Sequence, residues 1–149
     1  FQRTYFEHLA LAAESGLFDT LAHPDLVKNT APDDWDLDRV LDTIHSSLDR
    51  IAAAGTAMEL NTSGLNKNIA EMNPSAAILQ EMQQRNIPVV IGADAHNPQR
   101  VSANFIDALD TLDTVDYTHV SLFLNRERKE IPLDQARDSL LLPETAATT

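Results

Sequence analysis

The stretch Ile87-Pro-Val-Val-Ile-Gly-Ala-Asp-Ala-His-Asn-Pro98 decides the fold class of this 149-residue chain. Its first five residues are apolar without polar alternation, which is typical of a strand buried on both faces in a parallel sheet. Asp94 and His96 follow at the end of the strand, and their spacing predicts side chains on the same side of the backbone. Asn97-Pro98 predicts the start of a helix, with Asn97 as its cap. Asp94 and His96 are therefore half of a candidate metal site; alternatively, Asp94 caps a turn and His96 packs as a neutral ring.

Apolar residues at helical and strand spacings extend this pattern along the chain. Helices are predicted over residues 3–15, 37–54, 74–86, 101–112 and 133–142, and strands over residues 17–22, 56–60, 87–91 and 120–124. Asp36 and Asn73 are expected as N-caps and Gly55 as a helix stop. This alternation predicts an α/β fold with about four parallel strands, either a barrel or a doubly wound sheet. Residues 1–142 are expected to form part of a single domain, and residues 143–149 a flexible tail.

Composition excludes several classes of function. The formal net charge of -12 disfavours binding to nucleic acid or to anionic membrane surfaces. The chain has no cysteine, so disulfides and thiolate metal sites are excluded. It also lacks the run of about 20 apolar residues that crosses a membrane, and it has no signal-peptide pattern, so the cytoplasm is the expected compartment. Because it begins without methionine inside a helical pattern, we expect a piece of a longer protein.

Four polar residues lie just beyond the carboxyl ends of predicted strands, where α/β folds place their sites: His23, Asn61, Asp94 and His96. The proline that follows His23 holds this histidine in an extended or turn conformation, which suits a ligand, although a lone histidine at a strand end also fits a structural role. Glu59 and Asn61 share one face of their strand. They either orient ligands and bind substrate, or Asn61 and Ser63 satisfy a turn.

Three phrases of the sequence, in this order and at these separations, resemble the later motifs of the PHP (polymerase and histidinol phosphatase) superfamily, most of all its histidinol-phosphatase branch: Leu21-Ala-His-Pro-Asp-Leu-Val27, Glu59-Leu-Asn-Thr-Ser-Gly-Leu65 and Gly92-Ala-Asp-Ala-His96. The resemblance runs from about Tyr5 to about Pro132. It implies the C-terminal half of a distorted (β/α)7 TIM-like barrel. It also implies a cluster of up to three divalent metal ions, of zinc, manganese or iron, at the carboxyl ends of the strands.

The resemblance assigns roles to individual residues. It implies that His23, Asp94 and His96 bind metal, and that Asp94 and His96 act in catalysis through a metal-bound water. Residues expected to bind substrate or to support the ligands are Asn61, Lys67, Glu59 and Arg126. Two features depart from the family pattern: the amino-terminal His-x-His motif and the ligands after it are absent, and Asn66 stands where members often show a basic residue.

The implied function of the parent protein is that of a metal-dependent phosphoesterase with a small phosphorylated substrate. A histidinol-phosphate phosphatase of histidine biosynthesis is the first expectation. The alternatives are another PHP phosphoesterase, acting on a nucleotide or a sugar phosphate, and a non-catalytic metal-binding or scaffold fragment. The fragment alone is expected to be inactive. Its exposed sheet edges predict homo-oligomers.

Overall fold

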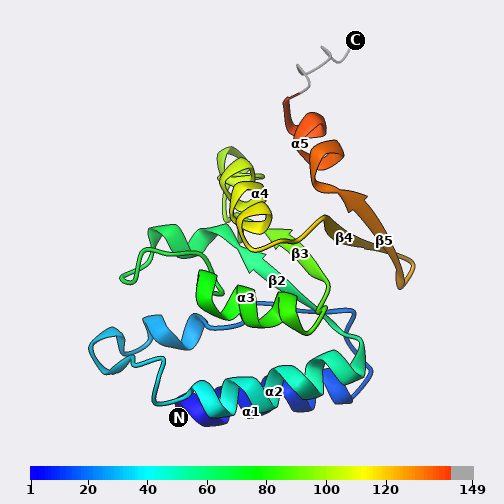
Figure 1. Cartoon of the computed structure of the whole chain (residues 1–149). Coiled ribbons are helices and arrows are strands. Elements are labelled where there is room, and N and C mark those ends of the chain that lie inside the picture. The colour runs from blue at the N-terminus through cyan, green and yellow to red at the C-terminus, as the bar shows by residue number, and fades with distance from the viewer. Residues whose placement is uncertain (142–149) are drawn as a thin grey trace.

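The computed structural model describes residues 1–141 and has an α/β architecture (Figure 1). A parallel sheet has the strand order β1 (Thr20–Leu21), β2 (Ala57–Asn61) and β3 (Val89–Gly92). Helices and 3-10 turns precede, connect and follow the strands. In chain order they are α1 (Gln2–Glu14), η1 (Leu26–Asn29), η2 (Pro32–Asp34), α2 (Leu41–Ala54), η3 (Thr62–Asn66), α3 (Ala76–Gln84), η4 (Pro98–Arg100), α4 (Phe105–Thr114) and α5 (Leu133–Leu141). The predicted tail over residues 143–149 lies outside the described residues. The order of helices and parallel strands confirms the α/β class.

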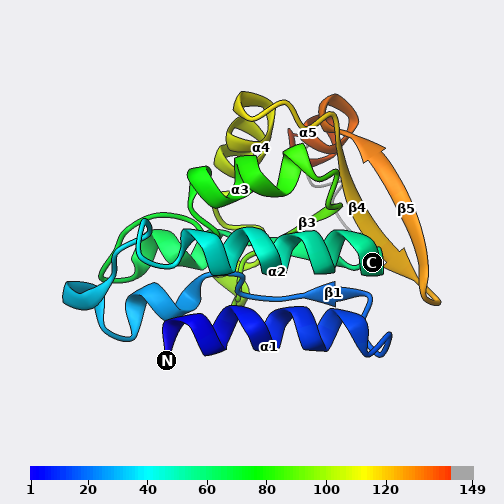
Figure 2. The same ribbon diagram turned by 60° about the horizontal axis from the view of Figure 1, so that its bottom comes forward.

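Helices α1 and α2 run side by side in the same direction (Figure 2). Arg3 near the start of α1 pairs with Asp42 near the start of α2, at 2.8 Å. Towards the other end, Arg50 of α2 bridges Glu7 and Glu14 of α1, at 2.7 Å each. A parallel pair of helices requires the chain to return between them, and β1 is part of that return segment.

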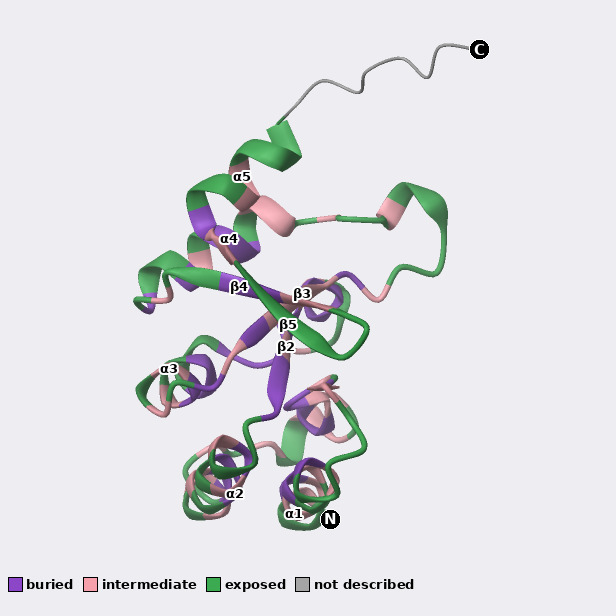
Figure 3. Cartoon of the chain, turned by 90° about the vertical axis from the view of Figure 1, so that its right-hand side faces the viewer, coloured by how far each residue is buried: buried purple, intermediate pink, exposed green. Residues whose placement is uncertain are grey.

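The core lies between the strands and the helix faces turned towards them (Figure 3). Its buried apolar side chains include Phe6, Ala10, Ile44, Leu48, Ile51, Met58, Leu60, Leu79, Val89 and Leu109. β3 is less buried than its apolar sequence predicted, because Val90 and Ile91 are only half-buried. Among the described residues, β3 has a hydrogen-bonded strand only on its β2 side.

The prediction of four parallel strands was wrong in its last member. β4 (His119–Leu124) pairs antiparallel with β5 (Glu127–Pro132) in a separate two-stranded sheet. Asn125 and Arg126 both have positive φ, 53° and 66°, as a two-residue hairpin turn requires. β4 nevertheless lies beside β3. In the segments that lead into the two strands, the Tyr117 hydroxyl donates to the Ile87 carbonyl at 2.9 Å.

Three predicted helix starts also differ. Asp36 accepts from the Asp38 N–H in a turn, and α2 begins only at Leu41, although Gly55 ends it as expected with φ 69°. Asn73 pairs its backbone with Asn61, so the cap of α3 passes to Ser75. The segment after Asn97-Pro98 makes only the 3-10 turn η4, because positive φ at residues 102 and 104 interrupts an α-helix before Phe105.

The predicted strand over residues 17–22 is confirmed only as the two residues of β1. Leu17 and Phe18 lie before it with exposed side chains. None of the helices within residues 1–141 combines the length and the apolar character that a membrane crossing needs.

Candidate functional site

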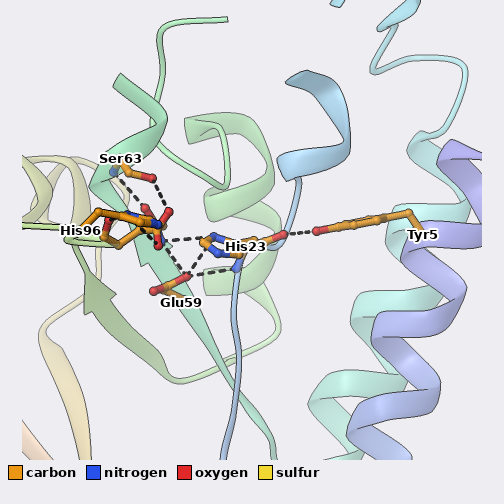
Figure 4. Close-up of polar contacts among 7 residues, drawn as sticks. Tyr5, His23, Glu59, Ser63 and His96 are labelled. Atoms are coloured by element: carbon orange, nitrogen blue, oxygen red, sulfur yellow. Dashed lines mark hydrogen bonds and ion pairs between the residues drawn. The ribbon is translucent and has the colours of Figure 1, made fainter. Parts of the chain in front are cut away.

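The carboxyl ends of the three parallel strands bring most of the predicted site residues together (Figure 4). His23 follows β1, Glu59 and Asn61 belong to the end of β2, and Asp94 and His96 follow β3. Polar contacts connect them in one row of residues, which starts at Tyr5 on α1. The row continues through His23, Glu59, Asn61, Ser63 and Asp94 to His96. The structure therefore places these residues at one edge of the sheet, beyond or at the carboxyl ends of its strands.

The His23 backbone is fixed from both sides in a left-handed conformation with φ 53°. Its N–H donates to Glu59 Oε2 at 3.0 Å, and its carbonyl accepts from the Tyr5 hydroxyl. Burial, together with the charge of Asp25, raises the pKa of Tyr5 to about 12, so its phenol remains a donor at neutral pH. Of the extended or turn conformations expected before Pro24, this positive φ fits only a turn, and the imidazole is half-buried.

Asn61 connects this histidine to the rest of the row. Its Oδ1 accepts from the Ser63 N–H at 2.8 Å, which caps η3 and turns Nδ2 towards Glu59 Oε2 (3.0 Å) and His23 Nδ1 (3.2 Å). Asn61 thus satisfies the turn and also contacts the imidazole of His23. Glu59 Oε2 lies 3.6 Å from His23 Nδ1.

Asp94 and His96 form the other end of the row. Ser63 Oγ lies 3.4 Å from Asp94 Oδ2. His96 Nδ1 lies 2.8 Å from the Asp94 carbonyl oxygen, and since a carbonyl can only accept, Nδ1 carries the proton. The neutral ring therefore presents the free lone pair of Nε2, which is the form that binds metals. With 83% of its side chain exposed, His96 is not packed in a core.

The histidine and carboxylate side chains of the site are suitable metal ligands, but there are too few of them to hold an ion. Within residues 1–141 no three His, Asp or Glu side chains are close enough together to hold an ion. Instead there are two pairs: Asp94 with His96, 3.9 Å apart, and His23 with Glu59. Asn61 and Ser63 connect these pairs. Asp94 and His96 are thus suited to supply two ligands, but further ligands have to come from elsewhere.

The two predicted basic residues lie in different places. Lys67 is exposed and lines a hollow of about 260 Å³ over the site, together with Ser63, Asn66, Asp94, His96 and Arg100. Arg126, by contrast, is not brought to the site. Its guanidinium contacts the carbonyls of Gly16 and Leu17 and the carboxylate of Asp19, all before the amino end of β1. β4 pairs with β5 in a separate sheet, and the turn between them carries Arg126 to the segment before β1.

The sequence prediction missed two residues that shape the site. Tyr5 was assigned only to a helix face, and nothing in its spacing shows that its hydroxyl reaches His23. Gly92 leaves the space that the Glu59 carboxylate occupies: a Cβ at residue 92 would lie 1.9 Å from Glu59 Oε1. A glycine at the end of an apolar strand is a signal of such a close approach.

Comparison with known proteins agrees with the motif phrases. No family model matches the chain. The chain is 36% identical over 130 residues to a protein of Deinococcus radiodurans named "Probable histidinol-phosphatase", covering 87% of this chain and 47% of that protein. It therefore spans about half the length of this curated relative. A crystal structure from Listeria monocytogenes, described as that of a "putative histidinol phosphatase", has a similar fold, with a TM-score of 0.62 and 24% identity over 71% of this chain and 43% of the other. The Deinococcus relative, together with the motif phrases, supports the histidinol-phosphatase branch of the PHP superfamily as the family of this chain.

Proposed function

We propose that the protein containing this chain is a metal-dependent phosphatase that hydrolyses the phosphate monoester of histidinol phosphate. One observation carries the proposal: Asp94 and His96 lie together after β3, and His96 offers a free Nε2, in a chain related to a protein named as a histidinol phosphatase. A carboxylate and a neutral imidazole without cysteine suit zinc, manganese or iron.

In this proposal His23, Asp94 and His96 would hold divalent metal, together with ligands from outside these 149 residues. Bound metal would supply charge neutralisation and a lowered pKa for water. The Asp94 carbonyl keeps the proton of His96 on Nδ1, so that Nε2 stays free. The Asn61 amide Nδ2 can only donate to His23 Nδ1 at 3.2 Å, so in this arrangement the proton of a neutral His23 lies on Nε2. To bind metal through Nε2, His23 would have to move that proton to Nδ1 and give up this contact.

The chain's own residues also prepare the site for an anion. The net charge of -12 on this chain repels phosphate, so cations are needed close to the reacting group. Lys67 stands at the hollow beside Asp94 and His96 with an exposed ammonium group. It attracts the substrate as a point charge. Ser63 and Asn61 hold the row beneath this hollow in place.

The test is an assay of the full-length protein with manganese or zinc, and again with a chelator. Histidinol phosphate, a sugar phosphate and a nucleotide are compared as substrates, which separates the proposed activity from that of another phosphoesterase. We expect the Asp94→Ala variant to lose activity, whereas Asp113→Ala, which removes an exposed carboxylate of α4, keeps it. If the full-length protein hydrolyses none of the three compounds with either metal, the proposal is wrong. The 149-residue chain alone is expected to be inactive, because its donor set is incomplete.

A further inference from the structure

Arg100, the last residue of η4, carries a guanidinium group that has no partner among residues 1–141. Its Nη2 atom is shielded from solvent, yet it makes no hydrogen bond within residues 1–141. Nor does any carboxylate of this part of the chain lie within 4.0 Å of the group. Arg50 and Arg85, by contrast, each bridge two carboxylates. A shielded N–H that lacks an acceptor is rare in folded proteins and calls for an explanation.

The position of Arg100 supplies one. The residue is half-buried and lines the hollow of about 260 Å³ that also contains Lys67, Asp94 and His96. Its backbone is held by two hydrogen bonds, from the Arg100 N–H to the Asn97 carbonyl at 3.1 Å and from the Ala103 N–H to the Arg100 carbonyl at 3.0 Å. Arg100 is therefore part of the wall of this hollow.

The opposite wall is tied to the same segment. Thr62 at the start of η3 donates its hydroxyl to the Ala103 carbonyl at 2.7 Å. This bond joins the turn that carries Lys67 to the turn that carries Arg100. The two cations consequently belong to one hollow rather than to separate loops. Asn66, also in its lining, carries no charge.

We propose that Arg100 binds the phosphate group of the substrate, with Lys67 as the second cation. This inference rests on the phosphatase function proposed above. A guanidinium presents parallel N–H donors that match two phosphate oxygens, and an unpaired group in a shielded position loses no existing partner when the anion arrives. Arg100 thereby provides the bidentate contact, while the exposed Lys67 contributes charge.

The experiment measures binding of inorganic phosphate to the 149-residue chain by calorimetry, once with manganese and once with a chelator. We expect the Arg100→Met variant to bind phosphate about 10- to 100-fold more weakly in at least one of the two solutions. Arg100→Lys should recover part of this loss, because it restores the charge without the bidentate geometry. The matched control is Arg128→Met, on the exposed hairpin strand β5, which should bind like the unaltered chain.

A second measurement does not depend on the folding of variants. The side-chain N–H resonances of Arg100 in the unaltered chain should shift as phosphate is added, whereas those of Arg128 should not. Unshifted Arg100 resonances, equal binding by Arg100→Met, or no binding by the unaltered chain in either solution would overturn the inference. The two proposals can fail separately. Phosphate binding through Arg100 in a protein without phosphatase activity refutes only the proposed function, and an active protein whose KM is unchanged by Arg100→Met refutes only the role of Arg100.

Discussion

The Glu59 carboxylate occupies the space that a side chain at residue 92 would need. Gly92 pairs with Asn61 in the β2–β3 register, so a Cβ at Gly92 would point to the face that carries Glu59, at 1.9 Å from Oε1 and 2.8 Å from Cδ. The missing side chain lets Glu59 lie over β3 with Oε2 directed to His23 and Asn61. Gly92 is thus required for space.

The first prediction concerns Gly92→Ala. The added methyl group should displace Glu59, release the His23 N–H and lower the free energy of unfolding by about 1–3 kcal/mol, as overpacking does. Urea unfolding of the 149-residue chain measures this change. A double variant, Gly92→Ala with Glu59→Ala, is the control, because it removes the group with which the methyl collides. If the effects of Gly92→Ala and Glu59→Ala on the free energy of unfolding are additive, the close approach of Glu59 to Gly92 does not cause the loss of stability.

The second prediction concerns the charge of Glu59. Glu59→Gln keeps the shape of the side chain but removes the negative charge of the carboxylate that lies 3.6 Å from His23 Nδ1 and accepts from the His23 N–H and from Asn61 Nδ2. We expect zinc or manganese affinity of the full-length protein to fall about 10- to 100-fold, which is typical when a supporting carboxylate of a metal-binding histidine is lost. Metal titration by calorimetry gives the affinity, and Glu130→Gln on the exposed face of β5 is the matched control. Equal affinities for Glu59→Gln and the unaltered protein would leave Glu59 without this role.

The third prediction concerns metal removal. An ion that binds only the folded protein should stabilise it by about 2.7 kcal/mol at a free concentration of 100 times its Kd. We therefore expect the Tm of the full-length protein to rise with zinc or manganese and to fall again with a chelator. His96→Ala should reduce this shift, whereas His119→Ala, which changes another exposed histidine, should retain it. A shift that survives His96→Ala would place the bound ion elsewhere.

The sequence alone could predict the parts of the fold that follow from local patterns. The apolar run before Asp94 and the stripe of Ile44, Leu48 and Ile51 predicted β3 and most of α2 correctly. The hairpin was missed because β5 reads Glu-Arg-Lys-Glu-Ile-Pro, a nearly all-charged stretch without the alternation of a half-buried strand. Its turn residue Asn125 was the available signal, since asparagine favours positive φ.

The arrangement of the site residues could likewise be predicted from the sequence only in part. The strand ends before His23, at Asn61 and before Asp94 could predict which side chains converge, because parallel strands end at one edge. The extended backbone assumed for the spacing of Asp94 and His96 was wrong, because β3 ends at Gly92 and Asp94 has φ 46°. The contact of Tyr5 with His23 could not be predicted in this manner, because it depends on how α1 packs against a loop 18 residues away. Arg126 was misplaced because its hairpin was missed.

The fourth prediction concerns a fully buried ion pair beneath the site. Lys28, with 0% of its side chain exposed, donates to Asp25 Oδ2 at 2.9 Å and to the Met72 carbonyl at 3.0 Å, and it lies 2.9 Å from Glu71 Oε1. Burial raises the pKa of the Asp25 carboxyl, while Lys28 and the Ser75 N–H act in the opposite direction. These contacts join the segment after His23 to the segment that leads into α3.

Lys28→Met leaves the Asp25 charge buried without its cation, so we expect the free energy of unfolding to fall by about 3–5 kcal/mol. Arg3→Met breaks an exposed pair and should cost about 0–1 kcal/mol in the same urea experiment. A double variant, Lys28→Met with Asp25→Leu, removes both charges and should recover much of the loss. If the double variant is no more stable than Lys28→Met, the uncompensated carboxylate is not the cause, and the loss follows from packing and from the bonds to Met72 and Ser75.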